Sequence, residues 1–167
     1  DKGGDNLDKK SFADFGVTDP IVDALEDKGI THPFPIQALT LGPALDRHDI
    51  IGQAKTGTGK TLGFGIPVLE DVIAPDEEGY EDLLNPNKPQ ALIILPTREL
   101  TKQVAQDLRD AAKYLSTRIV EIYGGVAFEP QIEALQRGAD IVVGTPGRLI
   151  DLLRKGHLHL SGVETVV

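Results

Sequence analysis

The stretch that decides the fold of this chain is Ala54-Lys55-Thr56-Gly57-Thr58-Gly59-Lys60-Thr61. Its second half matches the P-loop rule, whereas Ala54 stands where the strict rule has glycine. Gly57 and Gly59 allow backbone N–H groups to curve around a phosphate, and the helix expected near Lys60 points its positive end at the same anion. Lys60 adds charge toward the β and γ phosphates, and Thr61 can ligate Mg²⁺. A glycine-rich turn between a strand and a helix is the alternative, but Lys-Thr at this offset favours nucleotide binding.

Short apolar runs, rich in β-branched residues, lie before and after this loop. We expect buried strands over five of them, 49–51, 91–95, 119–123, 141–143 and 163–167. Helical patterns predict helices over 19–28, 35–45, 60–73, 98–115, 130–137 and 146–155. Strands that alternate with helices predict an α/β fold, in which helices flank a parallel sheet in three layers.

Three motifs follow three of the predicted strands, at the carboxyl ends where parallel sheets bind ligands. They are Pro96-Thr97-Arg98, Gly124-Gly125 and Thr145-Pro146-Gly147-Arg148. Each motif also has a purely structural interpretation. Thr97 and Thr145 suit the N-cap of a helix, and Pro146 suits the first helical position. The two glycines suit an ordinary turn after a strand.

These structural roles are compatible with binding, because helix N-termini and glycine turns present backbone N–H groups to phosphates. Arg98 and Arg148 would add positive charge at two of the helix ends. If the sheet is parallel, all three motifs open on one face. We expect a groove there for a single-stranded sugar–phosphate backbone, which is bound without reading base identity.

Gln37 is the candidate for base recognition, in the segment 29–37 before the phosphate loop. Its side-chain amide carries a donor and an acceptor, which together could contact N6 and N7 of adenine. A single glutamine on a helix is more often solvated. The phosphate loop lies fewer than twenty residues downstream, which strengthens the adenine interpretation.

The charge balance argues against binding nucleic acid by bulk charge. The 167 residues include 17 Lys and Arg against 26 Asp and Glu, which gives a net charge of −9. Five of the carboxylates lie within 76–82, and without them the rest of the chain carries −4, which leaves room for a local basic surface. The surrounding segment, 75–89, is predicted to be a mobile acidic insertion.

Other chemistry has little support in the sequence. Cysteine is absent, so no disulfide or thiolate metal site can form, which fits a reducing compartment and predicts a cytoplasmic protein. No run approaches the ~20 apolar residues of a membrane span. The histidines, His32, His48, His157 and His159, lack a cysteine or clustered carboxylates that would complete a metal site.

Taken together, the motifs resemble those of the DEAD-box RNA helicases. Residues 29–37 resemble the Q motif, 54–61 motif I, 96–100 motif Ia, 124–125 the GG element and 145–148 motif Ib. They occur in the order and at the spacing of the family, as far as the last residue. The resemblance extends to the bacterial RhlE-type helicases.

An isolated aromatic residue adds to the resemblance, and three positions depart from it. Phe12 stands 17 positions before Gly29, where the family has an aromatic residue that helps to hold adenine. Ile30 replaces the usual aromatic residue after Gly29, Phe34 replaces the usual Thr or Ser, and Thr101 replaces the usual Ala of motif Ia.

The resemblance implies a RecA-like P-loop fold that forms the N-terminal part of an ATP-dependent RNA helicase. Such an enzyme unwinds RNA duplexes locally and couples this to ATP hydrolysis, so ATP, Mg²⁺ and RNA are the implied cofactors and partner. Lys60 and Thr61 would be catalytic, with Mg²⁺ on Thr61. The implied nucleotide-binding residues are Phe12, Gln37, Ala54, Lys55, Thr56, Gly57, Thr58, Gly59, Lys60 and Thr61. The implied RNA-binding residues are Pro96, Thr97, Arg98, Gly124, Gly125, Thr145, Pro146, Gly147 and Arg148.

The expected domain organisation is a flexible end over 1–10 and an incomplete ATP-binding domain over 11–167. In the family, the Asp-Glu-Ala-Asp motif would begin one or two residues beyond Val167. A second RecA-like domain, which carries an arginine finger, would follow it. We therefore expect this chain alone neither to hydrolyse ATP at a useful rate nor to unwind duplexes.

Two alternatives remain open at this point. The first is another RecA-like P-loop ATPase, directed at DNA or at transport; Gln37, Phe12 and the segment 145–148 count against it. The second is a nucleotide-dependent binding module without turnover, because none of the strand ends at 95, 123 and 143 leads into an Asp or Glu.

Overall fold

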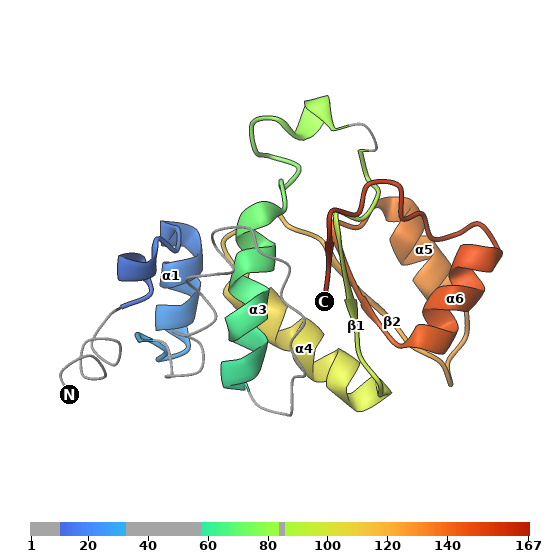
Figure 1. Cartoon of the computed structure of the whole chain (residues 1–167), viewed down its shortest axis with the longest axis horizontal. Helices are drawn as coiled ribbons and strands as arrows, with labels where there is room; N and C mark the ends of the chain where they lie inside the picture. Colours follow the sequence, from blue (N-terminus) through green and yellow to red (C-terminus); the bar gives the residue numbers. More distant parts are fainter. Residues whose placement is uncertain (1–10, 33–57, 84–85) are drawn as a thin grey trace. The chain divides into compact units, whose positions relative to one another are not determined.

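The computed structural model describes residues 11–32, 58–83 and 86–167 (Figure 1). The chain divides into two compact units, one of Asp1–Asp71 with Asp107–Leu115 and one of Val72–Gln106 with Ser116–Val167. The predicted end 1–10, helix 35–45 and strand 49–51 lie outside the described residues. Within the described part, no helix has both the length and the apolar character needed to cross a membrane.

Side chains near the helix ends hold the first unit together. Its described elements are η1 (Ala13–Phe15), α1 (Asp19–Asp27), α3 (Thr58–Asp71) and the last residues of α4 (Arg98–Ala111). Glu70 of α3 accepts hydrogen bonds from the backbone N–H and the hydroxyl of Thr18, the N-cap of α1, at 2.8 and 2.9 Å. Gly65 lets α3 approach α4 closely, because a Cβ there would lie 2.6 Å from Cδ2 of Leu108.

The predicted helices over 19–28, 60–73 and 98–115 are confirmed, with shifted ends. α3 begins at Thr58, within the predicted phosphate loop, and continues past Pro67. α4 ends at Ala111, short of the predicted end at 115. Beyond this end the chain turns, and the ammonium of Lys113 donates to the carboxylate of Asp27 at 3.0 Å.

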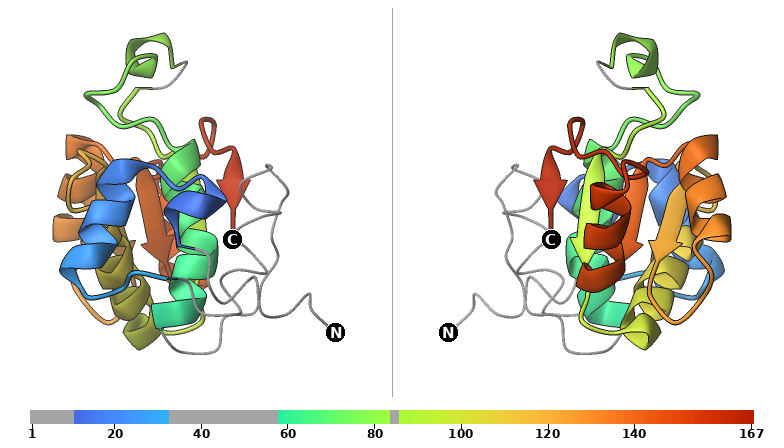
Figure 2. Two further views of the ribbon diagram at one scale, coloured as in Figure 1. Left: turned by 90° about the vertical axis from the view of Figure 1, so that its left-hand side faces the viewer. Right: turned by 90° about the vertical axis from the view of Figure 1, so that its right-hand side faces the viewer.

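The second unit contains a parallel four-stranded sheet in the order β2-β3-β1-β4 (Figure 2). The strands are β1 (Ala91–Ile94), β2 (Ile119–Ile122), β3 (Ile141–Gly144) and β4 (Thr165–Val166). All four lie within predicted strands or extend them by one residue. The register pairs both Ile94 and Ile122 with Gly144, so β1, β3 and β2 end at the same level.

Helices α5 (Glu129–Arg137) and α6 (Pro146–Arg154) cover one face of this sheet (Figures 1 and 2). The buried core between these helices and the sheet consists of Leu92, Val120, Ile122, Leu135, Ala139, Val142, Leu149, Leu152 and Leu158. Gly144 permits the close packing of α6, because a Cβ there would lie 2.8 Å from Cδ2 of Leu149. The predicted α/β class, with helices flanking a parallel sheet, is confirmed.

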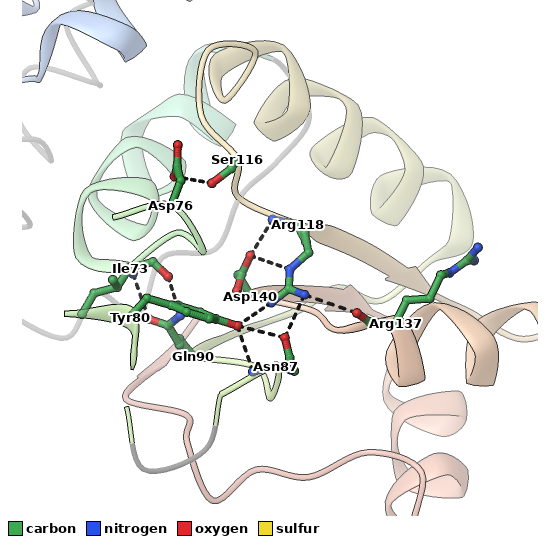
Figure 3. A network of polar contacts seen from close by, with 9 residues as sticks. All are labelled: Ile73, Asp76, Tyr80, Asn87, Gln90, Ser116, Arg118, Arg137 and Asp140. Carbon is green, nitrogen blue, oxygen red and sulfur yellow. Dashed lines mark hydrogen bonds and ion pairs between the residues drawn. The ribbon is translucent and has the colours of Figure 1, made fainter. Parts of the chain in front are cut away.

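A polar network lies at the amino edge of the sheet, which is the edge where the strands begin (Figure 3). Arg118 precedes β2 and forms an ion pair with the fully buried Asp140, which precedes β3, at 3.1 Å. The hydrogen bonds to this carboxylate raise the pKa of Arg118. Tyr80, in the short helix η2 (Tyr80–Asp82), accepts a hydrogen bond from Nη2 of Arg118 at 2.8 Å and donates one to Asn87 at 3.0 Å. This network joins the acidic segment to the amino edge of the sheet.

Candidate nucleic-acid interface

The three predicted motifs meet at the carboxyl edge of the sheet. Pro96–Arg98 follows β1, Gly124–Gly125 follows β2 and Thr145–Arg148 follows β3. Because these strands end at the same level, the motifs lie side by side along the edge. β3 lies between β2 and β1, so the strand that leads into the third motif is flanked by the strands that lead into the other two.

The motif after β1 caps helix α4. The hydroxyl of Thr97 accepts a hydrogen bond from the backbone N–H of Leu100 at 3.1 Å, as expected for an N-cap. Its carbonyl accepts one from the hydroxyl of Thr101, which is fully buried. Pro96, Thr97 and Arg98 are exposed, so the positive end of the α4 dipole faces solvent beside them.

The glycine pair after β2 adjoins this motif. Gly124 and Gly125 are both exposed, and Gly125 has a φ of +79°, which favours glycine. A Cβ on Gly125 would lie 3.8 Å from Nη1 of Arg98. The guanidinium of Arg98 also lies over the ring of Tyr123, 5.0 Å from its centroid. The charge of the first motif is therefore next to the turn of the second.

The motif after β3 begins helix α6 but directs its arginine inward. Thr145 is the N-cap and Pro146 starts the helix, as predicted, although the Thr145 side chain makes no capping hydrogen bond. Pro146 and Gly147 are exposed. Arg148, by contrast, is only 9% exposed, and its guanidinium lies 3.8 Å from the centroid of the Phe128 ring.

Hydrogen bonds complete the environment of Arg148 and tie the motifs together. Nη2 donates to the carbonyl of Val126 at 2.9 Å, and Nη1 donates to Oε1 of the buried Gln131 at 3.2 Å. The Gln131 amide donates in turn to the carbonyl of Tyr123 at 2.9 Å. In this structure Arg148 therefore supports the loop after β2.

Three residues that support this edge belong to none of the predicted motifs: Tyr123, Phe128 and Gln131. A signal for Gln131 was present, because a polar residue there interrupts the apolar face of the predicted helix 130–137. The two rings carry no such signal in the sequence, because an aromatic residue at a strand end or in a loop is usually part of a core.

The predicted nucleotide-binding residues are only partly within the described part. Gln37 and the loop residues Ala54, Lys55, Thr56 and Gly57 lie outside it, while residues 58–60 form the first turn of α3. Phe12 is 1% exposed and belongs to the core of the first unit, so its ring offers almost no free surface to a base.

Thr61 is 3% exposed, and its hydroxyl donates a hydrogen bond to the carboxylate of Asp107. Asp107 is itself buried, and its Oδ2 has no hydrogen-bond partner among the described residues. Burial raises the pKa of Asp107, and the nearby charge of Lys28 opposes that rise. The two side chains offer oxygen atoms of the kind that Mg²⁺ prefers. Among the described residues, however, no cluster of three or more His, Asp or Glu could hold a metal.

Comparisons with known proteins point to one family for this chain. The DEAD/DEAH box helicase family matches residues 34–167. The chain is 47% identical over 164 residues to DEAD-box ATP-dependent RNA helicase 3B, chloroplastic, of Zea mays, covering 98% of the chain and 21% of that protein. It is 42% identical over 162 residues to ATP-dependent RNA helicase RhlB of Proteus mirabilis, covering 96% of the chain and 37% of that protein.

Solved structures show the same fold. A DEAD box protein from Methanococcus jannaschii superposes with a TM-score of 0.75 at 37% identity, covering 93% of this chain and 40% of that one. A hypothetical ATP-dependent RNA helicase from Sulfolobus tokodaii gives a TM-score of 0.73 at 38% identity, covering 88% and 39% of the two chains. This chain thus spans less than half the length of the relatives it matches.

Proposed function

Because this chain belongs to the DEAD/DEAH box helicase family and has its RecA-like fold, we propose that it binds ATP and RNA as the N-terminal lobe of an ATP-dependent RNA helicase. Residue identity over almost the whole chain supports the family, and two relatives carry RNA helicase in their names. The assignment to another class of RecA-like ATPase, directed at DNA or at transport, has no comparable support.

The observation that carries the RNA proposal is the level carboxyl edge of β1, β3 and β2. It brings two helix N-termini, at Thr97 and Thr145, and the exposed Gly124–Gly125 turn into one row. Helix N-termini and glycine turns suit phosphate oxygens, and the Arg98 guanidinium adds a charge. Such a row contacts the sugar–phosphate backbone, so we propose binding that is independent of base sequence.

For ATP, we propose that the loop 54–61 holds the phosphates and that Gln37 selects adenine. The start of α3 at Thr58 supports the first part, because it directs a helix N-terminus toward the preceding loop. Mg²⁺ bound with ATP would neutralise charge on the phosphates. Thr61 would supply one of its oxygen ligands, and Lys60 would contact the β and γ phosphates. The buried Phe12 would act on this site through the packing of the first unit.

In the full-length protein, we propose that a second RecA-like lobe closes on this one over ATP and RNA. Closure would bend one RNA strand and so separate it from its complement. The reaction itself would be transfer of the γ-phosphoryl group of ATP to water.

Calorimetric titration with ADP–Mg²⁺ and with GDP–Mg²⁺ tests the nucleotide site. We expect ADP alone to bind and Gln37→Ala to abolish the preference. Equal binding of both nucleotides would contradict the role of Gln37. Binding of neither, in a chain extended beyond Val167, would contradict the phosphate loop.

Binding without turnover is a second candidate, favoured by one observation. The described strands β1, β2 and β3 lead into Leu95, Tyr123 and Thr145 and carry no Asp or Glu at these ends, although a P-loop hydrolase needs an acid at a strand end. Phosphate release from ATP in the presence and absence of RNA distinguishes the two. RNA-stimulated release by this chain would exclude the second candidate.

A further inference from the structure

Tyr123 lies under two cations at the carboxyl edge of the sheet. The Arg98 guanidinium carbon is 5.0 Å from the centroid of its ring, and the Lys102 ammonium is 5.6 Å from it. Arg98 and Lys102 are four residues apart in α4, so both project from the same face of the helix. Tyr123 comes directly after β2, and side chains alternate along a strand. Its ring therefore leaves the sheet on the face opposite Ile122 and the α5–α6 core.

The aromatic ring determines where these two charges lie. Each cation is attracted to the negative face of the aromatic ring. The two cations repel each other, and an anion between them would relieve that repulsion. Both side chains are exposed, and Nη1 of Arg98 is already next to the Gly125 turn. The ring thus holds two charges, beside the motif after β1 and the glycine turn after β2.

A second aromatic ring in this unit lies next to two cations in a different environment. Phe128 also contacts two cations, Arg148 and Lys155, each 3.8 Å from its centroid. There the arginine is buried, and two of its N–H groups donate to the carbonyl of Val126 and to Gln131. The arginine over Phe128 therefore belongs to the packing of this unit, whereas both cations over Tyr123 are exposed.

We propose that Lys102 is a further phosphate-binding residue and that Tyr123 is the positioning residue that holds Arg98 and Lys102 together. The ligand is the phosphodiester next to the one that Arg98 contacts, on single-stranded RNA. This inference rests on the proposed RNA function and adds a contact beyond the residues of the three predicted motifs. The phosphate is bound through its charge, so every base sequence is accepted.

The test measures binding of a fluorescein-labelled oligouridylate to this chain by fluorescence anisotropy at several KCl concentrations. Each phosphate contact on a single strand contributes about 0.7 to the slope of log affinity against log salt. We expect both Lys102→Gln and Arg98→Gln to lower the slope by about that amount. Lys113→Gln makes the same charge change just beyond the other end of α4, and should leave the slope unchanged.

Two substitutions of Tyr123 test its positioning role. Tyr123→Phe keeps the ring face and should bind with the wild-type affinity and slope. Tyr123→Leu removes the ring and should weaken binding as much as loss of a phosphate contact does, with an unchanged circular dichroism spectrum. If Tyr123→Leu fails to fold, the exposed Lys102 still decides the question, because its substitution leaves the core intact.

The outcomes separate this inference from the function on which it rests. A wild-type chain that does not bind the RNA would overturn both. Binding that depends on Arg98 but is indifferent to Lys102 would overturn the second phosphate contact alone. Equal loss in Tyr123→Phe and Tyr123→Leu would overturn the role of the ring face.

Discussion

Asp107 shows how one buried carboxylate can cost this chain stability. It is 8% exposed, it accepts a hydrogen bond from Thr61, and within the described part of the chain its Oδ2 has no hydrogen-bond partner. Burial raises its pKa in the folded state above the value of 3.8 for the free side chain. The neutral form of Asp107 is therefore more favoured in the folded state than in the unfolded state. Stability is highest below the unfolded pKa and falls as pH rises through the interval up to the folded pKa.

We predict that Asp107→Asn raises the free energy of unfolding at neutral pH by about 1 kcal/mol, because it removes the charge and keeps the shape. For a chain of this size that is a rise of about 2–4 °C in Tm, measurable by thermal denaturation followed by circular dichroism. The gain should vanish below the unfolded pKa, where wild-type Asp107 is neutral too. Asp110→Asn, at a half-exposed site paired with Lys28 at 2.6 Å, should bring no gain. A less stable Asp107→Asn variant at neutral pH would contradict the prediction.

Gly138 makes room for the ion pair at the amino edge of the sheet. Its φ is +112°, and a Cβ there would lie 2.8 Å from Cζ of Arg118. A side chain at this position would strain the backbone and displace Arg118 from Asp140, whose carboxylate has no solvent exposure. A buried carboxylate that loses its partner is expensive.

We predict that Gly138→Ala lowers the free energy of unfolding by at least about 3 kcal/mol, as measured by urea denaturation. Gly156→Ala is the matched control, because Gly156 has a φ of +78° with nothing within 4 Å of the added Cβ. It should cost about 1–2 kcal/mol, from backbone strain alone. Equal losses in the two variants would show that displacement of Arg118 carries no cost.

At the scale of elements, α5 and α6 hold the loop between β2 and α5 in place. Arg148 at the start of α6 donates to the carbonyl of Val126, and Gln131 at the start of α5 donates to the carbonyl of Tyr123. The two carbonyls that accept these bonds, those of Tyr123 and Val126, lie on either side of Gly124 and Gly125 in the chain. Two helix starts thus fix a turn whose glycines have few restraints of their own.

We predict that Arg148→Gln weakens RNA binding several-fold and leaves the salt slope unchanged, since it disturbs the loop and removes no phosphate contact. Unpairing of the buried Gln131 should lower the free energy of unfolding by about 1–3 kcal/mol. Amide hydrogen exchange over 124–128 should become faster. The exposed Arg154 lies on the same helix, and Arg154→Gln should change none of these quantities. A salt slope that falls as much as in Arg98→Gln would show that Arg148 contacts phosphate directly.

At the scale of the second unit, the acidic charge is separated from the binding motifs. The acidic residues of the segment 75–89 lie toward the amino edge, where Tyr80 joins the segment to Arg118. The motifs lie at the carboxyl edge. The four residues of β1 separate the two edges by about 13 Å, whereas the Debye length at physiological salt is about 8 Å. A net charge of −9 is therefore compatible with a site for an anionic strand.

We predict that replacing Glu77, Glu78, Glu81 and Asp82 with their amides changes RNA affinity less than twofold at physiological salt. At low ionic strength the screening is weaker, and the same variant should bind more tightly than the wild type. Glu99 is exposed in the first turn of α4 beside Arg98, so Glu99→Gln should raise affinity even at physiological salt. Anisotropy titrations at both ionic strengths measure these effects. A large gain from the fourfold variant at physiological salt would show that the acidic segment acts on the groove.

Much of this architecture follows from local sequence patterns alone. Buried strands are runs of β-branched residues, helices show apolar spacing and an N-cap, and turns have glycine where φ is positive. These patterns act over a few residues, so the four strands of the sheet, the cap at Thr97 and the start of α6 at Pro146 were all predictable. The placement of three motifs at one edge also followed, because parallel strands share the direction of their carboxyl ends.

Only the tertiary structure decided which side chains meet. The sequence predicts that Arg148 adds positive charge at a helix end, whereas the fold buries its guanidinium between Phe128 and Gln131. The ring of Tyr123 meets α4 because β2 runs beside β3, which in turn pairs with β1. The strand order 2-3-1-4 is a property of packing between segments far apart in the chain. A single sequence specifies which residues lie on each face of a helix or strand. Which faces pack against each other depends on how all the helices and strands bury their apolar surface together.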